Sequence, residues 1–181
     1  MLKRLAAGDA HAFRVTVARF TPQLAALARR MLRDDAEAED IVQEALVRLW
    51  RNAATLELGP YGLRPWLRRV VSNLCIDRMR SAKPVDVTGE LPEVPEPATQ
   101  LRTIEARETS ARVTEALRAL PDRQRVALTL FHFEGLSQIE VGQMLAISDE
   151  AVESLLARAR RTLKVALKDE WRSLLPSAEE G

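Results

Sequence analysis

The stretch LSQIEVGQMLAISDEAVESLLARARRTLK, residues 136–164, decides how the C-terminal half of this chain folds. Ser137 and Glu140 have the spacing of a capping box, which predicts that a helix begins at Gln138. The segment 146–148 is a tight turn, and Ser148 is a favourable N-cap for a second helix. In that second helix, apolar residues recur at helical spacing and predict one buried stripe, formed by Val152, Leu155, Leu156, Ala159 and Leu163. The pattern fits a helix-turn-helix motif, and it also fits an ordinary helical hairpin with solvated charges.

The outer face of the second helix carries acids at its beginning and cations further along. The helix dipole favours the carboxylates of Asp149 and Glu150 in the first turn, whereas Glu153 lies at the next turn and gains less. A glutamate can also accept a hydrogen bond from the amino group of cytosine, so a DNA-reading role for these acids stays open. If the motif binds DNA, the residues placed to contact it are Glu150, Glu153, Ser154, Ala157, Arg158 and Arg161.

The composition of the whole chain predicts an all-α protein. It has 181 residues, of which 46% are hydrophobic and only 4% aromatic, and its apolar residues recur at helical spacing almost throughout. The net charge of +1 excludes a uniformly basic nucleic-acid-binding protein, but it allows acids and cations to be segregated on different surfaces. Cys75 is the single cysteine, so an intramolecular disulfide is excluded. Because no apolar run approaches the length of a membrane span and the N-terminus lacks a signal-peptide pattern, we expect a cytoplasmic protein without membrane insertion.

Residues 83–100, KPVDVTGELPEVPEPATQ, interrupt the helical pattern with four prolines and a net charge of −3. This composition is typical of an extended, solvated linker. We therefore expect two small helical domains, 1–82 and 103–172, joined by a flexible linker at 83–102 and followed by a tail at 173–181. Proline and glycine positions then predict helices near 9–19, 22–33, 35–53 and 64–81 in the first domain, and near 103–119, 122–134, 137–145 and 149–170 in the second.

Two segments of the first domain have opposite charge. Residues 34–44 carry six acids and no cation, and a core stripe of Val42, Ala45, Leu46, Leu49 and Trp50 runs along the same helix. A second stripe contains Asp40, Gln43, Glu44 and Val47, which suits either a solvated helix or a surface for a basic protein.

Residues 64–83 have the opposite charge to this acidic segment, with six cations and one acid. Cations can bind phosphates, an asparagine can contact base edges, and a tryptophan can stack, so this helix suits a nucleic acid. For Trp66, packing in the core is at least as good an explanation as contact with DNA. The candidate DNA-contacting residues are Arg64, Trp66, Arg69, Asn73, Asp77 and Arg80.

Three stretches occur in the order in which one protein family carries them: AEDIVQEALVRLW (38–50), PWLRRVVSNLCIDRMR (65–80) and the segment 120–163 that contains the helix-turn-helix. Over about residues 9–170 the chain resembles the extracytoplasmic-function (ECF, group 4) sigma factors of bacterial RNA polymerase, in the sigma-70 family. The resemblance implies a region 2 domain, a flexible linker and a region 4 domain. It also implies a monomer when free that directs promoter-specific transcription initiation, with core RNA polymerase, promoter DNA and an anti-sigma factor as partners.

The resemblance also implies roles for the segments singled out above. Asp40, Gln43, Glu44 and Val47 match the surface that grips the β′ coiled coil of core polymerase, while region 4 would bind the β flap. The basic helix matches the segment that melts and recognises the −10 element, and the loop 59–65 matches the one that captures a flipped base. The outer face of the last helix, including Ser154 and Arg158, matches the part that recognises the −35 element.

The chain departs from the family pattern in that last helix. Where many members carry Gly-Thr-Val-Lys-Ser-Arg, residues 150–155 read EAVESL, so two usual cations are replaced by Glu153 and Leu155. This leaves open a sigma-like decoy that binds an anti-sigma factor but not DNA, and a free-standing helix-turn-helix repressor is a further alternative. His11 and His132 have no partners at metal-ligand or catalytic spacing, so we expect no enzyme activity, no metal and no cofactor.

Overall fold

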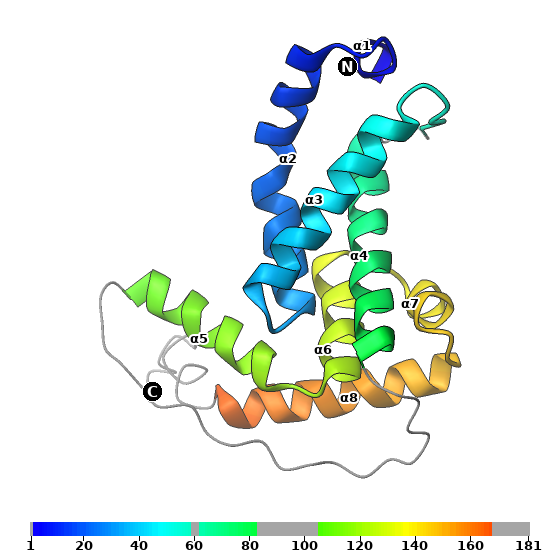
Figure 1. Cartoon of the computed structure of the whole chain (residues 1–181). Coiled ribbons are helices and arrows are strands. Elements are labelled where there is room, and N and C mark those ends of the chain that lie inside the picture. Colours follow the sequence, from blue (N-terminus) through cyan, green and yellow to red (C-terminus); the bar gives the residue numbers. More distant parts are fainter. Residues whose placement is uncertain (1, 59–61, 83–104, 168–181) are drawn as a thin grey trace, which may run out of the picture.

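The computed structural model describes residues 2–58, 62–82 and 105–167, and these residues form helices and connecting turns without a β-strand (Figure 1). The expected all-α fold is confirmed for the described residues. The expected linker at 83–102, the tail at 173–181 and residues 59–61 lie outside the described residues. The elements are α1 (Leu2–Ala6), α2 (Ala10–Met31), α3 (Asp35–Asn52), α4 (Leu63–Ala82), α5 (Glu105–Ala119), α6 (Asp122–Leu128), the π-helical turn η1 (Thr129–Phe133), α7 (Gln138–Leu145) and α8 (Asp149–Ala166).

In the N-terminal half, α2, α3 and α4 pack against one another around an aliphatic core. The side chains of Asp9 and Asp34 cap α2 and α3 by accepting hydrogen bonds from backbone amides of the first turn, which fixes where the two helices begin. The innermost residues of this core have almost no exposed surface; they include Leu24, Met31, Leu49, Leu67 and Val71.

The expected break at Pro22 is wrong, because α2 is one continuous helix that contains this proline. A proline inside a helix removes one backbone hydrogen bond and crowds the preceding turn. Here both sides of Pro22 belong to a helix that packs along α3 and α4, and residues on both sides, such as Thr16 and Leu27, are buried. Tertiary packing therefore outweighs the local cost of the proline.

In the C-terminal half, the capping box and the turn form as the sequence predicts. Ser137 accepts a hydrogen bond from the amide of Glu140, and the Glu140 carboxylate accepts one from the amide of Ser137. Ala146 ends α7 in the left-handed conformation at φ 55°, and Ser148 caps α8. Val152, Leu156 and Ala159 are buried and Leu155 and Leu163 are half-buried, so the predicted apolar stripe is also present.

The turn between α7 and α8 requires a glycine that the sequence pattern did not single out. A Cβ atom added to Gly142 would lie 2.9 Å from the backbone oxygen of Ile147 and 3.2 Å from Oδ1 of Asp149. The contacting oxygen belongs to the backbone, and the amide of Ile147 is itself bonded to the carbonyl of Gly142, so the turn has little freedom to move away. Gly142 therefore allows the close approach that sets the angle between the two helices.

We expect Gly142→Ala to destabilise this half by about 1–3 kcal/mol, since the added methyl group overpacks a closely packed turn. Ala146→Gly is the matched control, and it should stabilise the same half. Alanine in the left-handed conformation costs about 1 kcal/mol, and glycine removes that cost. Urea denaturation followed by circular dichroism would measure both free energies of unfolding. An unchanged free energy for Gly142→Ala would show that the turn can relax at no cost.

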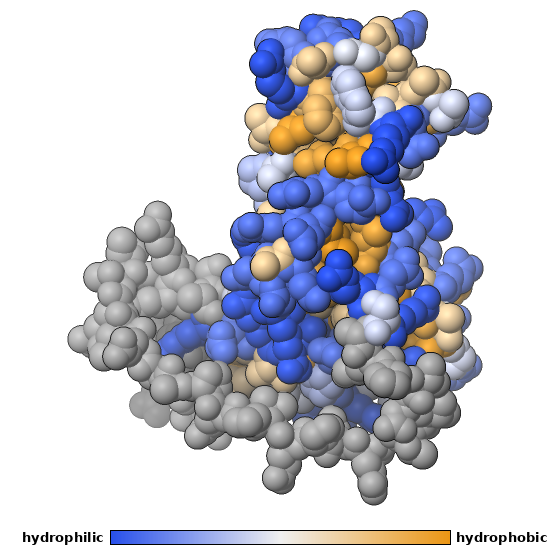
Figure 2. All heavy atoms as spheres, viewed as in Figure 1, coloured by the Kyte–Doolittle hydropathy of each residue, from blue (hydrophilic) through white to orange (hydrophobic). Residues whose placement is uncertain are grey.

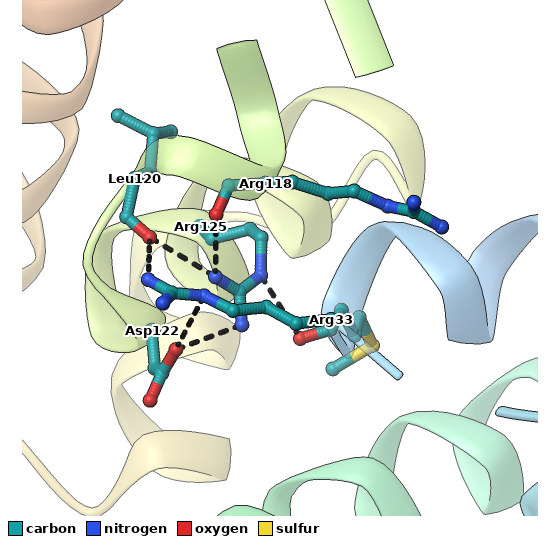
Figure 3. A network of polar contacts seen from close by, with 6 residues as sticks. Arg33, Arg118, Leu120, Asp122 and Arg125 are labelled. Carbon is teal, nitrogen blue, oxygen red and sulfur yellow. Dashed lines mark hydrogen bonds and ion pairs between the residues drawn. The ribbon is translucent and has the colours of Figure 1, made fainter. Parts of the chain in front are cut away.

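The two halves are joined by a buried arginine (Figure 3). Arg125 of α6 is 1% exposed, and its guanidinium group donates to the carbonyl of Met31, 3.1 Å away at the end of α2, and to the carbonyl of Leu120 at 3.0 Å. It also forms an ion pair with Asp122 at 2.9 Å. Burial lowers the pKa of Arg125 from its ordinary value, while Asp122 opposes that shift. The sequence pattern did not predict this contact between the two halves.

Candidate functional site: three surfaces on two helical domains

The first surface is the outer face of α8. Glu150, Glu153, Ala157, Arg158 and Arg161 are exposed, while Ser154 is half-buried. The pKa of the Glu150 carboxyl is lowered by hydrogen bonds from its own backbone amide and from Ser148, so a structural reason for an acid at this position is present. The structure therefore places the predicted contact residues on one accessible face. Their contacts with DNA and their preference for particular bases stay predictions.

The second surface lies on α3. Asp40, Gln43 and Val47 are exposed, and Glu44 is half-buried and paired with Arg48 at 2.8 Å. A shallow groove of about 310 Å³ runs beside them between α3 and α4, lined by Asp40, Ile41, Glu44, Leu74, Asp77, Arg78 and Ser81. Acids around a shallow groove are suited to a partner that presents cations along a narrow ridge.

Exposed apolar side chains continue this second surface. Figure 2 shows hydrophobic side chains gathered across α2 and α3 in the upper half of the view, above a more hydrophilic surface. Val15, Val47 and Trp50 are about two fifths exposed, and the Trp50 ring lies 4.9 Å from the ring of Phe13. The expectation that Trp50 belongs to the core stripe is therefore wrong, because near the end of α3 its side chain stays about two fifths exposed. An exposed apolar cluster beside acids is typical of a protein-binding surface.

The third surface is the basic face of α4. Arg64, Arg69, Asn73, Asp77 and Arg80 are exposed, and all five line one groove with a volume of about 950 Å³. An amide and a carboxylate at its centre, with cations around them, can hydrogen-bond to base edges while phosphates bind at the rim.

Trp66 differs from the other residues predicted to bind DNA. Its side chain is half-buried, packs against the hydrophobic core and is not among the residues that line the α4 groove. A tryptophan held this way fixes the start of α4 relative to the core.

The opposite wall of the α4 groove comes from the C-terminal half, a feature that the sequence pattern did not predict. This wall contains Glu134, Leu136, Glu140, Gln143 and Met144. Arg68 of α4 forms a forked pair with the carboxylate of Glu134, including one bond of 2.5 Å, and donates to the carbonyl of Phe133 at 2.9 Å. The Glu134 pair raises the pKa of Arg68 above its ordinary value. Because 66 residues separate these partners, no local pattern identifies them.

Within 2–58, 62–82 and 105–167, no cluster of three or more His, Cys, Asp or Glu side chains is arranged to hold a metal ion. No helix in the described part of the chain is both long and apolar enough to cross a membrane. The thiol of Cys75 is buried, which together with Glu37 raises its pKa to about 12, so it is a poor nucleophile at neutral pH.

Comparisons with known proteins identify both halves. Residues 16–85 match the family described as Sigma-70 region 2, and residues 110–163 match the family described as Sigma-70, region 4. The chain is 34% identical over 157 residues to the ECF RNA polymerase sigma factor SigM of Mycobacterium tuberculosis, covering 87% of this chain and 78% of SigM. It is also 34% identical over 170 residues to the "Probable RNA polymerase sigma factor RfaY" of Xanthomonas campestris pv. campestris, covering 90% of this chain but only 42% of that protein.

Solved structures give the same result for the fold. The chain superposes on CnrH, solved in complex with the cytosolic domain of CnrY, with a TM-score of 0.54 and 29% sequence identity. The match covers 93% of this chain and 95% of CnrH, so both helical halves contribute to the similarity.

Proposed function

Since the chain belongs to the extracytoplasmic-function group of RNA polymerase sigma factors, in the sigma-70 family, we propose that it binds core RNA polymerase and directs initiation at particular promoters. The observation that carries this proposal is the segregation of charge within the N-terminal half. The acidic surface of α3 and the basic face of α4 lie on neighbouring helices of one core, so polymerase and DNA can be bound at the same time. The protein then supplies recognition, while polymerase supplies the chemistry of RNA synthesis.

The acidic surface of α3 is the site proposed for the β′ coiled coil of core polymerase. Asp40 and Glu44 would pair with cations of the partner, Gln43 would hydrogen-bond, and Val47 with Trp50 would add apolar area. A polar rim beside a small apolar centre is the usual composition of such an interface.

The face of α4 is the site proposed for the −10 element. Arg64, Arg69 and Arg80 would hold phosphates, and Asn73 and Asp77 would contact base edges of the separated strand. Phosphate contacts position the strand, whereas the amide and carboxylate provide preference for particular bases.

The outer face of α8 is the site proposed for the −35 element, and here the chain's unusual residues matter. Leu155 replaces a common cation, and its half-buried side chain packs against the core of the C-terminal half. Glu153 replaces another cation and is exposed. These two substitutions favour a second candidate function, a decoy that binds an anti-sigma factor without binding DNA. The intact basic face of α4 argues against the decoy.

In vitro transcription from genomic fragments, with core polymerase plus this protein, tests the proposed function directly. Transcripts that depend on the added protein and begin at a common sequence would support it and would identify the promoter elements. If the protein neither bound core polymerase nor supported transcription from any fragment, the decoy would be favoured, whereas retained polymerase binding would argue against it.

Control by an anti-sigma factor is part of the proposal. The structure of the similar protein CnrH contains a partner chain, the cytosolic domain of CnrY, and the exposed acids and apolar side chains of α3 offer a protein partner a surface to bind. Co-purification from native cells, with and without stress, would test whether a partner other than polymerase is present.

Arg158→Ala and Glu153→Ala should have different effects on −35 binding. If Arg158 contacts a phosphate, its removal should weaken binding evenly across sequences and reduce the slope of log affinity against log salt concentration by about 1. If Arg158 instead binds a guanine, the preference for guanine at one position should weaken by about 1–3 kcal/mol. Removal of the Glu153 carboxylate should strengthen non-specific binding, because a negative charge beside phosphates opposes association.

Binding of the two variants and the parent chain to a −35 library at two salt concentrations measures these effects. If Glu153→Ala loses the preference for one base at one position, Glu153 contacts a cytosine. If the variant binds more tightly with unchanged base preference, Glu153 acts only as a negative charge on the helix surface. Weaker binding of Glu153→Ala to every sequence would contradict both interpretations.

A further inference from the structure

The accessible face of α3 has acids at one end, apolar side chains in the middle and a cation at the other end. It is formed by residues that recur at helical spacing and lie within about 60° of Val47 around the helix axis, namely Asp40, Glu44, Val47, Trp50 and Arg51. All of them are exposed except Glu44, which is half-buried. The proposed contact with polymerase uses the acids and the apolar side chains of this face, but it has no use for Arg51.

Arg51 is an unneutralised cation on a face that is proposed to bind a basic partner. Its side chain forms no ion pair or hydrogen bond within the part of the chain that the structure describes, whereas Arg48, at the edge of the same face, is bonded to Glu44 at 2.8 Å. A partner that presents only cations would be repelled by Arg51. A partner with acids at one end of its surface would instead be attracted to it.

A second copy of α3 provides such an acidic end when the two helices run antiparallel. A two-fold axis beside Val47 places each end of the face opposite the other end of the same face in the second copy. Along the helix axis, Arg51 lies about 6 Å from Val47 on one side. Glu44 and Asp40 lie about 4.5 Å and about 10.5 Å from Val47 on the other side. The guanidinium group of each Arg51 would therefore lie between two carboxylates of the other copy.

The apolar middle of the face lies on the same two-fold axis. Val47 and Trp50 are partly exposed, and Figure 2 shows that hydrophobic side chains continue from α3 across to α2, where Val15 is also exposed. In a two-fold interface each of these side chains is covered in both copies. An apolar centre between charged ends is the usual composition of a protein interface.

The neighbouring helices strengthen the difference in charge between the two ends. The start of α2 lies beside the end of α3, as the contact of Phe13 with Trp50 shows, and α1 also packs against α3 (Figure 1). These segments add two exposed cations, Lys3 and Arg14, to the basic end of the molecule. At the other end, residues 34–44 carry six acids and no cation. An antiparallel pair of chains therefore brings a basic end against an acidic end twice.

We propose that this face of α3 binds a second copy of the chain in an antiparallel, two-fold symmetric dimer. The dimer differs from the monomer that the family resemblance implies. It covers Asp40, Glu44 and Val47, so a chain in the dimer cannot bind core polymerase through these residues. The dimer stands independently of the proposed function, and only this competition rests on it. Because one helix face and its flanks form a small interface, we expect association at micromolar concentrations.

Sedimentation velocity of the full chain, without polymerase, measures the association. At about 100 µM protein and low salt, we expect a species with a mass approaching twice that of one chain. Its fraction should fall as salt is added, because salt screens the charge pairs at the two ends of the interface. A single monomeric species at every protein concentration would overturn the proposal.

Two charge reversals test the antiparallel arrangement. Glu44→Arg and Arg51→Glu each place like charges opposite one another, so each variant alone should dimerise at least about 10-fold more weakly than the parent chain. An equimolar mixture of the two should regain the parent affinity, because each variant then faces a partner of opposite charge. A mixture that associates no more tightly than either variant alone would overturn the arrangement.

Matched reversals elsewhere control for net charge and for unfolding. Glu115→Arg and Arg123→Glu make the same changes in charge at exposed positions of α5 and α6 and should dimerise like the parent chain. Circular dichroism should show that all four variants are folded. Equal weakening by the reversals on α3 and by these controls would overturn the proposed interface.

Cross-linking measures the competition with polymerase. Val47→Cys places a thiol beside the two-fold axis, so a short bismaleimide should join two copies, whereas Val165→Cys, an exposed position of α8, should give little product. The thiol of Cys75 is buried and stays protonated at neutral pH. Core polymerase added first should reduce the joined fraction at least about 5-fold. Undiminished cross-linking of chains that also bind polymerase would overturn the competition. A dimer that forms normally from chains unable to bind polymerase would instead overturn the proposed function and support the dimer.

Discussion

Reversing the charge of Asp40 and Glu44 to lysine should abolish binding to core RNA polymerase while leaving the helix folded. The two side chains lie beside one shallow groove, so the double substitution converts an acidic surface into a basic one at its centre. A partner that presents cations would then face like charges, which costs several kcal/mol at an interface. Pull-down of β′ with the purified variant, followed by core-dependent transcription, would measure the loss.

Two controls separate this effect from unfolding and from net charge. Within the described residues, the double substitution breaks the ion pair of Glu44 with Arg48, a solvent-accessible pair four residues apart that contributes less than about 1 kcal/mol. Circular dichroism should therefore be unchanged. Glu57→Lys combined with Glu115→Lys makes the same change in charge at exposed positions away from the groove and should retain polymerase. Unchanged pull-down of β′ by the Asp40→Lys, Glu44→Lys variant would show that polymerase binds elsewhere.

Arg125→Met should destabilise the protein by about 3–5 kcal/mol, although methionine keeps most of the side-chain volume. The substitution removes the donor to the carbonyl of Met31, one of the two donors to the carbonyl of Leu120, which keeps its bond from Arg33, and the buried partner of Asp122. Buried polar groups that lose their partners carry the full cost of desolvation. Urea denaturation of the full chain would measure the change in the free energy of unfolding.

Arg123→Met is the matched control, because Arg123 is exposed and lies two residues earlier on the same helix. A change within about 0.5 kcal/mol is expected there. Similar values for the two variants would mean that the buried guanidinium group contributes no more than a surface arginine. Arg125→Lys should lie between the parent chain and Arg125→Met, since a single ammonium group cannot reproduce the forked set of hydrogen bonds.

The helices and their faces could be predicted from sequence because their causes are local. The capping box of Ser137 and Glu140, the N-cap at Ser148 and the apolar stripe of α8 all depend on residues within one or two turns. The same holds for the faces of α3 and α4, whose predicted residues lie along accessible sides of their helices, with Trp66 as the exception.

The errors arose where a local signal met a tertiary contact. Pro22 has a strong tendency to end a helix, but packing along α3 and α4 keeps α2 continuous. Trp50 follows the helical period of the core stripe, yet it lies near the end of α3, where its ring packs against Phe13 and is still about two fifths exposed. Arg125 stands beside an apolar run, and its burial depends on a carbonyl 94 residues away in the chain.

The sequence by itself determined most of the helices, the caps at Ser137 and Ser148 and the accessible faces of α3, α4 and α8, because each follows from spacing along a single helix. Its resemblance to a known family indicated the two-domain fold. Only the tertiary structure decided how the two halves meet. The Arg68–Glu134 pair, the Arg125 contact with Met31 and the contact of Arg80 with Met144 on the α4 face join residues 64 to 94 positions apart. Such contacts leave no periodic trace in a sequence, since they depend on the shape and charge of two separately folded surfaces.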